Sequence, residues 1–241
     1  MANNHIHDYY SIFSYFAEQM GEPFEWWEDK KVLDFGGNWG NVLRDPKCTI
    51  KPENYWAVDV SKSAMEAGAA RFPRAHWHHY NRWNFMYNYT GNLHEPLPDM
   101  GTFDVILSYS VLTIGEMPEM VRTINEDLLP LLNPGGVFMN TYLSMDDEWP
   151  MRFFLRKRGN TPEEVQQLLD EARSKDFVYF VGKNILTQSE EELRSLPQDV
   201  MLTFYKDEKI QQLFPTCEIK PVVLRDDRHC QKCMVFRNTG L

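Results

Sequence analysis

The chain has 241 residues, of which 43% are hydrophobic and 25% are charged, and its formal net charge is −10. This length and composition suit one large globular domain and argue against wholesale disorder. The acidic balance gives no general attraction to phosphate backbones, and no stretch approaches about 18 consecutive apolar residues, so we expect neither a nucleic-acid nor a membrane partner.

The N-terminal sequence and the cysteines indicate a reducing compartment. The first residues, MANNHIHDYYSIFSYF, lack the basic and apolar regions of a secretory signal. The cysteines are too few and too scattered for a disulfide framework. They are Cys48, Cys217, Cys230 and Cys233. We therefore expect a cytoplasmic protein with reduced thiols, and the sequence leaves its oligomeric state open.

Strand and helix patterns alternate through the first 143 residues. Aromatic residues at helical spacings predict a helical cap over 1–30. The predicted strands are 31–35, 54–60, 75–80, 103–109 and 137–143, and the predicted helices are 62–71, with Ser61 as its N-cap, and 116–132. Such alternation indicates an α/β fold, a mostly parallel sheet with helices on both faces.

The alternation stops after residue 144. We interpret 145–204 as an insertion, with a helix that begins at Thr161, an apolar segment over 177–181 and a helix near 189–195. A closing part, 205–241, holds a helix over 206–213 and strands over 217–224 and 230–237. Only residues 225–229 separate these strands, so they must form an antiparallel hairpin. The prediction is one domain, 1–241, with 31–144 as its ligand-binding core.

The stretch KVLDFGGNWGN at 31–41 has the form of a buried strand that runs into a glycine loop. Gly36 and Gly40 have no Cβ, so the backbone can approach a ligand closely. A tight strand–helix turn would give the same pattern. Asp59, which ends the second strand, strengthens the ligand interpretation because a carboxylate there can accept both hydroxyls of a ribose. It could also cap the helix that follows.

The loop differs from a dinucleotide site, which requires G-x-G-x-x-G. Asn38 replaces the middle glycine and Trp39 would crowd a pyrophosphate. Asp34, directly before the glycines, is poorly placed beside phosphates and well placed to attract an ammonium. Asn38 tolerates a positive φ better than other non-glycine residues.

Four segments resemble the motifs of class I S-adenosylmethionine-dependent methyltransferases of the small-molecule type. VLDFGGNWG is similar to their first motif, AVDVSKSAMEAG to the second, FDVILSYSVL to the fourth strand, and LLPLLNPGGVFMNTYL to the helix, P-G-G turn and fifth strand. The resemblance covers about 31–143 and 206–237. It implies a Rossmann-like seven-stranded sheet with an antiparallel C-terminal hairpin strand, and S-adenosylmethionine as cofactor.

The resemblance also implies roles for individual residues. The methionine part of the cofactor would be held by Asp34, Gly36, Gly37, Asn38 and Gly40. Asp59 would bind the ribose and Val60 would lie against one adenine face. Asn81 and Arg82 follow the third strand, where the family often uses an acidic residue for the adenine amino group, and Asn81 can still accept that hydrogen bond. Ser108 would face the methionine amino group.

Catalytic and acceptor-binding residues are less clearly indicated. Small-molecule members often carry a histidine soon after the fourth strand, and none occurs over 109–114. The candidate bases are Tyr109, Tyr142 and Asp146, and for each of them a role as a wall residue is the favoured alternative. The acceptor pocket would be built from the N-terminal aromatics and the insertion, with Tyr10, Tyr15, Arg152 and Arg156 as candidates. Helix packing and a solvated helix face are their alternatives.

Two histidine- and cysteine-containing stretches do not indicate a metal site. In His76-Trp77-His78-His79 a strand would place His79 opposite the other histidines, and the C-x-x-C of Cys230 and Cys233 lacks further ligands. Our interpretation is a methyltransferase that acts on a small-molecule metabolite. The alternatives are an NAD(P)-dependent oxidoreductase and a non-catalytic S-adenosylmethionine-binding protein of the same fold. The sequence identifies neither the acceptor, nor the atom methylated, nor the pathway.

Overall fold

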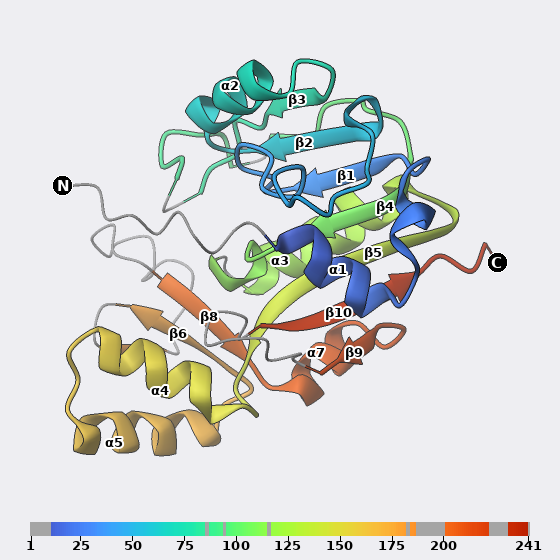
Figure 1. Ribbon diagram of the computed structural model, residues 1–241. Helices are drawn as coiled ribbons and strands as arrows, with labels where there is room; N and C mark the ends of the chain where they lie inside the picture. The colour runs from blue at the N-terminus through green and yellow to red at the C-terminus, as the bar shows by residue number, and fades with distance from the viewer. Residues whose placement is uncertain are drawn as a thin grey trace.

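The computed structural model describes residues 11–84, 87–93, 95–114, 117–181, 184–186, 201–221 and 231–240. Within them, seven strands form the main sheet in the order β3-β2-β1-β4-β5-β10-β9 (Figure 1). The strands are β1 Val32–Phe35, β2 Tyr55–Asp59, β3 His76–His79, β4 Phe103–Ser108, β5 Leu132–Ser144, β9 Glu218–Lys220 and β10 Lys232–Arg237. The first five are parallel, and β10 is antiparallel to both β5 and β9. This confirms the predicted Rossmann-like sheet.

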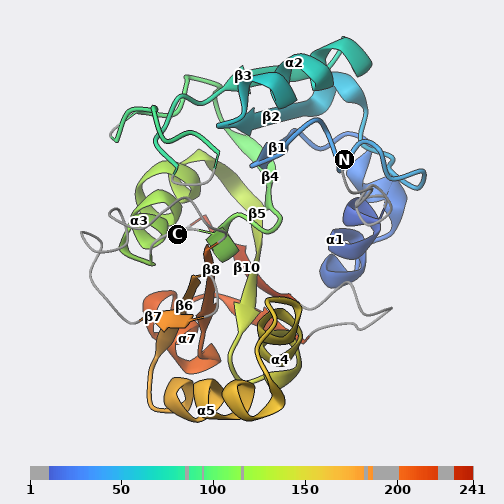
Figure 2. The same cartoon turned by 90° about the vertical axis from the view of Figure 1, so that its left-hand side faces the viewer.

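Side chains that alternate along the central strands build a separate core on each face of the sheet. On β4, Val105 and Leu107 belong to one core, and Ile106 belongs to the other. The first core is covered by α1 (Ile12–Met20) and α2 (Lys62–Arg71), the second by α3 (Met117–Arg122) and α7 (Asp207–Leu213). Figure 2 shows α1 and α3 on opposite sides of the sheet.

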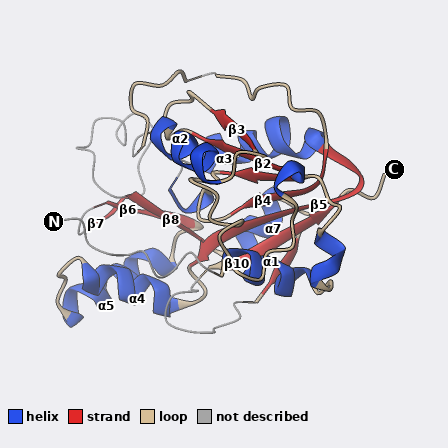
Figure 3. Ribbon diagram, turned by 45° about the horizontal axis from the view of Figure 1, so that its top comes forward, coloured by secondary structure: helices blue, strands red, loops and turns tan. Residues whose placement is uncertain are grey.

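The 145–204 segment extends the sheet from the end of β5. Its strand β8 (Met201–Tyr205) pairs in parallel with the last two residues of β5, and β6 (Phe177–Val181) pairs antiparallel with β8 and with β7 (Asn184–Leu186). Helices α4 (Glu148–Lys157) and α5 (Pro162–Arg173) pack on these strands around a third apolar core (Figure 3). The helix predicted near 189–195 lies outside the described residues.

Three predicted elements have wrong boundaries. The helix expected over 116–132 is α3 followed by a π-helical turn over Thr123–Leu128 and a 3-10 turn over Leu129–Leu131. Strand β5 begins at Leu132 rather than 137, because the P-G-G turn pairs with the C-terminal segment: the Gly135 N–H donates to the Asn238 carbonyl (2.7 Å), and the Asn238 N–H donates to the Gly136 carbonyl (2.9 Å). The expected strand 217–224 ends at Lys220, and residues 222–230 lie outside the described part.

The start of α5 offers a direct test of local structure. The Thr161 hydroxyl accepts from the Glu164 N–H (3.2 Å), while the Glu164 carboxylate accepts from the Thr161 N–H (2.7 Å). Thr161→Ala removes one half of this capping box, so we expect a loss of about 1 kcal/mol in the free energy of unfolding. Differential scanning calorimetry should show a Tm lower by about 2–4 °C. Thr90→Ala, in an exposed loop, is the control and should leave Tm unchanged.

Candidate functional site

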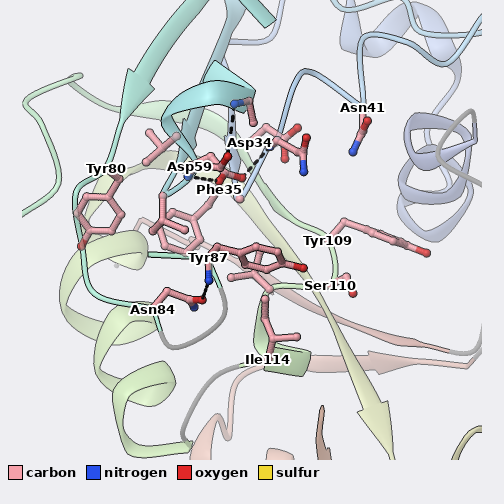
Figure 4. Close-up of a pocket in the computed structure, with 18 of the residues that line it drawn as sticks. Asp34, Phe35, Asn41, Asp59, Tyr80, Asn84, Tyr87, Tyr109, Ser110 and Ile114 are labelled. Carbon is pink, nitrogen blue, oxygen red and sulfur yellow. Dashed lines mark hydrogen bonds between the residues drawn. The ribbon is translucent and has the colours of Figure 1, made fainter. Parts of the chain in front are cut away.

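A cavity of about 700 Å³ opens at the carboxyl ends of β1, β2 and β4 (Figure 4). The strand order reverses there, since β1 pairs with β2 on one side and with β4 on the other. Ligands of open α/β sheets bind at such a point. The first wall consists of residues that end or follow β1 and β2: Asp34, Phe35, Gly36, Gly37, Asn38, Trp39, Asn41, Val42, Val58, Asp59, Val60 and Ser61.

Two glycines of the loop after β1 have no room for a side chain. Gly36 has φ +77°, and a Cβ there would stand 2.2 Å from a Val111 methyl carbon. Gly40 has φ +84°, and its Cβ would stand 2.8 Å from the Trp77 ring. Both positions need the left-handed region that glycine enters without strain. The loop is therefore packed closely against Val111, which follows β4, and against Trp77 of β3.

We expect Gly36→Ala to lower the free energy of unfolding by about 2–4 kcal/mol. The left-handed conformation costs alanine about 1 kcal/mol and forced packing against Val111 adds about 1–3 kcal/mol. Gly21→Ala is the matched control, because Gly21 has φ +74° and nothing within 4 Å of its added Cβ. Urea denaturation of the two variants separates the cost of the Val111 contact from the cost of the left-handed backbone. Equal losses in the free energy of unfolding would show that the Val111 side chain moves aside at little cost.

Asn38 takes the place of the middle glycine and adopts φ 49°. Its N–H donates to Asp59 Oδ2 (2.9 Å), and its Oδ1 accepts from the Trp39 N–H (2.8 Å). The side chain thus stabilises its own left-handed backbone, as asparagine can. Asn38 in place of the middle glycine therefore keeps a loop geometry that would be strained with a β-branched residue.

Asp59 lies at the end of β2 with both carboxylate oxygens directed at backbone N–H groups. Oδ1 accepts from Ser61 (2.8 Å) and Oδ2 from Asn38 (2.9 Å). Burial raises the pKa of Asp59, and these two hydrogen bonds oppose the shift. Each oxygen keeps a second lone pair. The two carboxylate oxygens can therefore accept hydrogen bonds from two neighbouring hydroxyls while the backbone N–H groups hold the carboxylate in place.

Asp34 is buried at the end of β1 and accepts a hydrogen bond from the Tyr55 hydroxyl (2.5 Å). Burial raises the pKa of Asp34 to about 7; the Tyr55 hydrogen bond opposes the shift, and nearby Asp59 adds to it. A buried carboxyl of this kind favours a cationic partner, since an opposite charge restores the ionised form. The sequence analysis did not include Tyr55, because nothing in the order of residues links the start of β2 to the end of β1.

The other predicted cofactor residues divide into two groups. Val60 and Arg82 line the cavity. Asn81 and Ser108 are not among its described lining residues. The Asn81 Oδ1 accepts from the Asn88 amide (3.1 Å), and Ser108 is buried within β4.

Arg82 is buried and joins the loop after β3 to the α3 region. Its guanidinium donates to the Tyr80 hydroxyl (2.9 Å), forms an ion pair with Glu119, and lies 3.5 Å from Asp127 Oδ2. Arg122 also pairs with Glu119 (2.9 Å). The Arg82 charge is therefore neutralised by carboxylates of the helical segment opposite.

Of the three candidate bases, only Tyr109 lines the cavity, and its ring lies edge-on to Tyr15 (5.8 Å between centroids) and Phe16 (6.0 Å) of α1. Tyr142 and Asp146 are not among the cavity's described lining residues. Tyr142 is fully buried and donates to Asp207 (2.9 Å), and burial with the Asp207 charge holds its pKa far above the usual range. Asp146 accepts from the Asp207 N–H (2.8 Å). Both are carried past the cavity because β5 continues to Ser144.

None of the predicted acceptor residues is among the described lining residues of the cavity. Tyr10 lies outside the described residues, and the Tyr15 hydroxyl donates to the Gln231 carbonyl (3.1 Å). Arg152 pairs with Glu148 (2.8 Å) on α4, and Arg156 is exposed on the same helix. Neither arginine lines the cavity. The predicted segments contribute through other side chains: Ile12 of α1, Phe154 of α4 and Leu202 of β8.

A closed hydrogen-bond network supports the cavity wall after β4. Ser110, at φ 61°, donates its N–H to Thr141 Oγ1 (2.8 Å) and accepts from the Gln231 amide (3.0 Å). Thr141 donates in turn to Gln231 Oε1 (2.6 Å). Ser110 and Gln231 are 121 positions apart, so no sequence pattern could have joined them.

The described residues contain no group of three or more histidine, cysteine, aspartate or glutamate side chains that could hold a metal ion. Cys230 of the C-x-x-C pattern lies outside them. Across the same ranges, no helix has both the length and the apolar composition to cross a membrane.

Residues 33–138 match the sequence profile of a family described as a methyltransferase domain. No curated protein sequence matches the chain significantly. Similar solved structures include an S-adenosylmethionine-dependent methyltransferase from Clostridium acetobutylicum, with 15% identity, 94% of this chain and 97% of that chain covered, and a TM-score of 0.51.

Two further structures are similar over nearly the whole chain. CalS10, an amino pentose methyltransferase from Micromonospora echinaspora, shares 14% identity, covers 96% of this chain and 92% of its own, and has a TM-score of 0.53. The CcbJ methyltransferase from Streptomyces caelestis shares 11% identity, covers 95% and 94%, and has a TM-score of 0.52. At such identities the likeness shows the fold alone.

Proposed function

We propose that this protein, a class I S-adenosylmethionine-dependent methyltransferase, transfers the methyl group of its cofactor to a small-molecule acceptor. One observation carries the proposal. The cavity that begins at Asp34, Asp59 and the glycine loop continues, without interruption, to aromatic and aliphatic walls supplied by α1, α4 and β8. One cavity thus combines an end suited to a nucleoside with an opposite end that has an apolar wall.

The residues at the first end fit the cofactor. A Cβ at Gly36 would fill space already taken by Val111, so only glycine keeps this loop geometry in the cavity wall. We propose that Asp34 receives the ammonium of the methionine part, that Asp59 receives the ribose hydroxyls, and that Val60 lies against the adenine. Asn81 and Ser108 retain the roles suggested by the resemblance only as proposals, since neither is among the described lining residues.

The bound cofactor supplies a methyl group on a sulfonium, which needs no covalent help from the protein. The contribution of the chain is to bind, to orient and to exclude water. Tyr109, held by the rings of Tyr15 and Phe16, forms a firm wall for the acceptor. The Ser110–Thr141–Gln231 network fixes the backbone beneath that wall. We therefore assign Tyr109 to positioning of the acceptor.

We also propose a small-molecule acceptor and a cytoplasmic location. CalS10 is named as an amino pentose methyltransferase, which favours a small acceptor here too. We also propose that the four segments 1–30, 31–144, 145–204 and 205–241 act as one domain, because α1, α4 and β8 all border the same cavity.

The proposal is tested by incubation of the protein with S-adenosylmethionine carrying a radiolabelled methyl group. Separate reactions contain a pooled small-molecule extract, total RNA and a protein mixture. We expect label in the low-mass fraction alone. Label in RNA or in protein would contradict the small-molecule acceptor without touching the methyltransferase assignment.

A further inference from the structure

We propose that the acceptor is a ring-bearing small molecule without an acidic group, an aromatic amine or a neutral aromatic compound rather than a carboxylate or phosphate ester. This inference rests on the proposed function. The observations behind it are the aromatic side chains and the charged side chains of the cavity beyond Asp34 and Asp59.

Aromatic side chains reach that part of the wall from three separate segments of the chain. Trp83 and Tyr87 come from the loop after β3, Tyr109 follows β4, and Phe154 belongs to α4. In Figure 4 the Tyr87 ring lies across the cavity, between the Asp59 group above and Ile114 below. The Tyr87 N–H donates to Asn84 Oδ1 (3.0 Å), which anchors the residue that carries the ring. Rings presented from several sides favour a flat ligand through stacked and edge-on contacts.

The charged side chains that line the cavity fall into two groups, two acids at the cofactor end and an ion pair beyond them. Within the described residues they are Asp34, Asp59 and Glu119, with Arg82 as the basic one. The Arg82 side chain is only 7% exposed and is paired with both Glu119 and Asp127. Its positive charge is therefore already matched by two carboxylates before any ligand enters.

An acidic acceptor would meet this arrangement at a disadvantage. Its charge would lose water, and the guanidinium of Arg82 is already engaged by Glu119 and Asp127. The arginines that could have met an acid, Arg152 and Arg156, lie on α4 outside the cavity lining. A neutral or cationic ring avoids this cost, and a cation gains from the aromatic faces. The site therefore discriminates against acids because the cost of removing their charge from water is not offset.

Matched pairs of compounds test the inference on the complex with S-adenosylhomocysteine. Isothermal titration first establishes that S-adenosylhomocysteine binds; failure at this step counts against the proposed function. Tryptamine and tryptophan, tyramine and tyrosine, and indole and indole-3-acetate are then titrated into the complex. The members of each pair differ by one carboxylate or carboxymethyl group. We expect each compound that lacks the acid to bind at least ten times more tightly than its acidic partner.

A charge variant gives an independent readout. Glu119→Gln removes an acid from the lining and releases part of Arg82, so we expect the preference against tryptophan and indole-3-acetate to fall at least tenfold. Glu126→Gln is the control, because Glu126 pairs with Arg122 rather than with Arg82 and is not among the lining residues, and it should leave the preference unchanged. Equal or tighter binding of the acidic members to the unmodified protein overturns the inference, and so does a failure of every non-acidic ring compound to bind.

Discussion

Replacement of Asp59 by alanine should lower the affinity for S-adenosylhomocysteine by at least about 100-fold. Two hydrogen bonds from ribose hydroxyls to a charged carboxylate contribute about 1.5–3 kcal/mol each, and 1.4 kcal/mol is a factor of ten in affinity. The change also frees the N–H groups of Asn38 and Ser61, which Asp59 now holds at 2.9 and 2.8 Å. Isothermal titration calorimetry of the purified variant measures the loss.

Asp29→Ala is the control for this experiment. Asp29 is exposed and its ion pair with Lys51 (2.5 Å) lies away from the cavity lining, so the variant removes the same charge without touching the site. Circular dichroism of Asp59→Ala should match that of the unmodified protein. An Asp59→Ala variant that folds and binds S-adenosylhomocysteine with unchanged affinity would refute the ribose assignment.

Affinity for S-adenosylhomocysteine should depend on pH through Asp34. Burial raises the pKa of Asp34 to about 7 in the free protein, whereas the ligand ammonium favours the ionised carboxylate. Below pH 7 a proton must leave before the pair forms. The affinity should therefore rise about tenfold per pH unit as the pH approaches 7, and level off above it while the ligand amine stays protonated. Titrations at pH 5.5, 6.5 and 7.5 measure the slope.

Asp34→Asn should bind more weakly and lose this slope, while the amide oxygen of the new side chain can still accept from Tyr55. The stability of the free protein should depend on pH in the opposite direction to the ligand affinity. Because folding raises the pKa of Asp34 from 3.8 to about 7, Asp34 stabilises the folded state most below pH 4, and that contribution disappears as the pH rises to 7. A slope that persists in Asp34→Asn would assign the pH dependence to another group.

The sequence predicted the parts of the fold and site that depend on neighbours along the chain. The glycine loop at 36–40 and Asp59 each follow a short strand, and parallel strands must end at one edge of the sheet. Ser61 caps α2, accepting from the Ala64 N–H, and Thr161 caps α5, as their local patterns indicate. Asn38 takes up the left-handed backbone expected of an asparagine at that position.

The sequence did not predict contacts between distant segments, and it did not predict the full length of strand β5. The Tyr55–Asp34 hydrogen bond and the Ser110–Gln231 contact arise from strand register, which only the assembled sheet defines. Strand β5 runs from Leu132 to Ser144 because it pairs with β4, β10 and β8 in turn. That extension carries Tyr142 and Asp146 to Asp207, away from the edge at which we expected them.

The central claim is that the loop after β1 and Asp59 hold S-adenosylmethionine. A thermal melt with S-adenosylmethionine, S-adenosylhomocysteine and NADH in separate samples tests it most directly. A ligand at 100 times its dissociation constant adds about 2.7 kcal/mol, or roughly 5–11 °C in Tm for a chain of this size. We predict such a shift with S-adenosylmethionine and S-adenosylhomocysteine and none with NADH. A shift with NADH alone would contradict the account and favour a nicotinamide-dependent oxidoreductase.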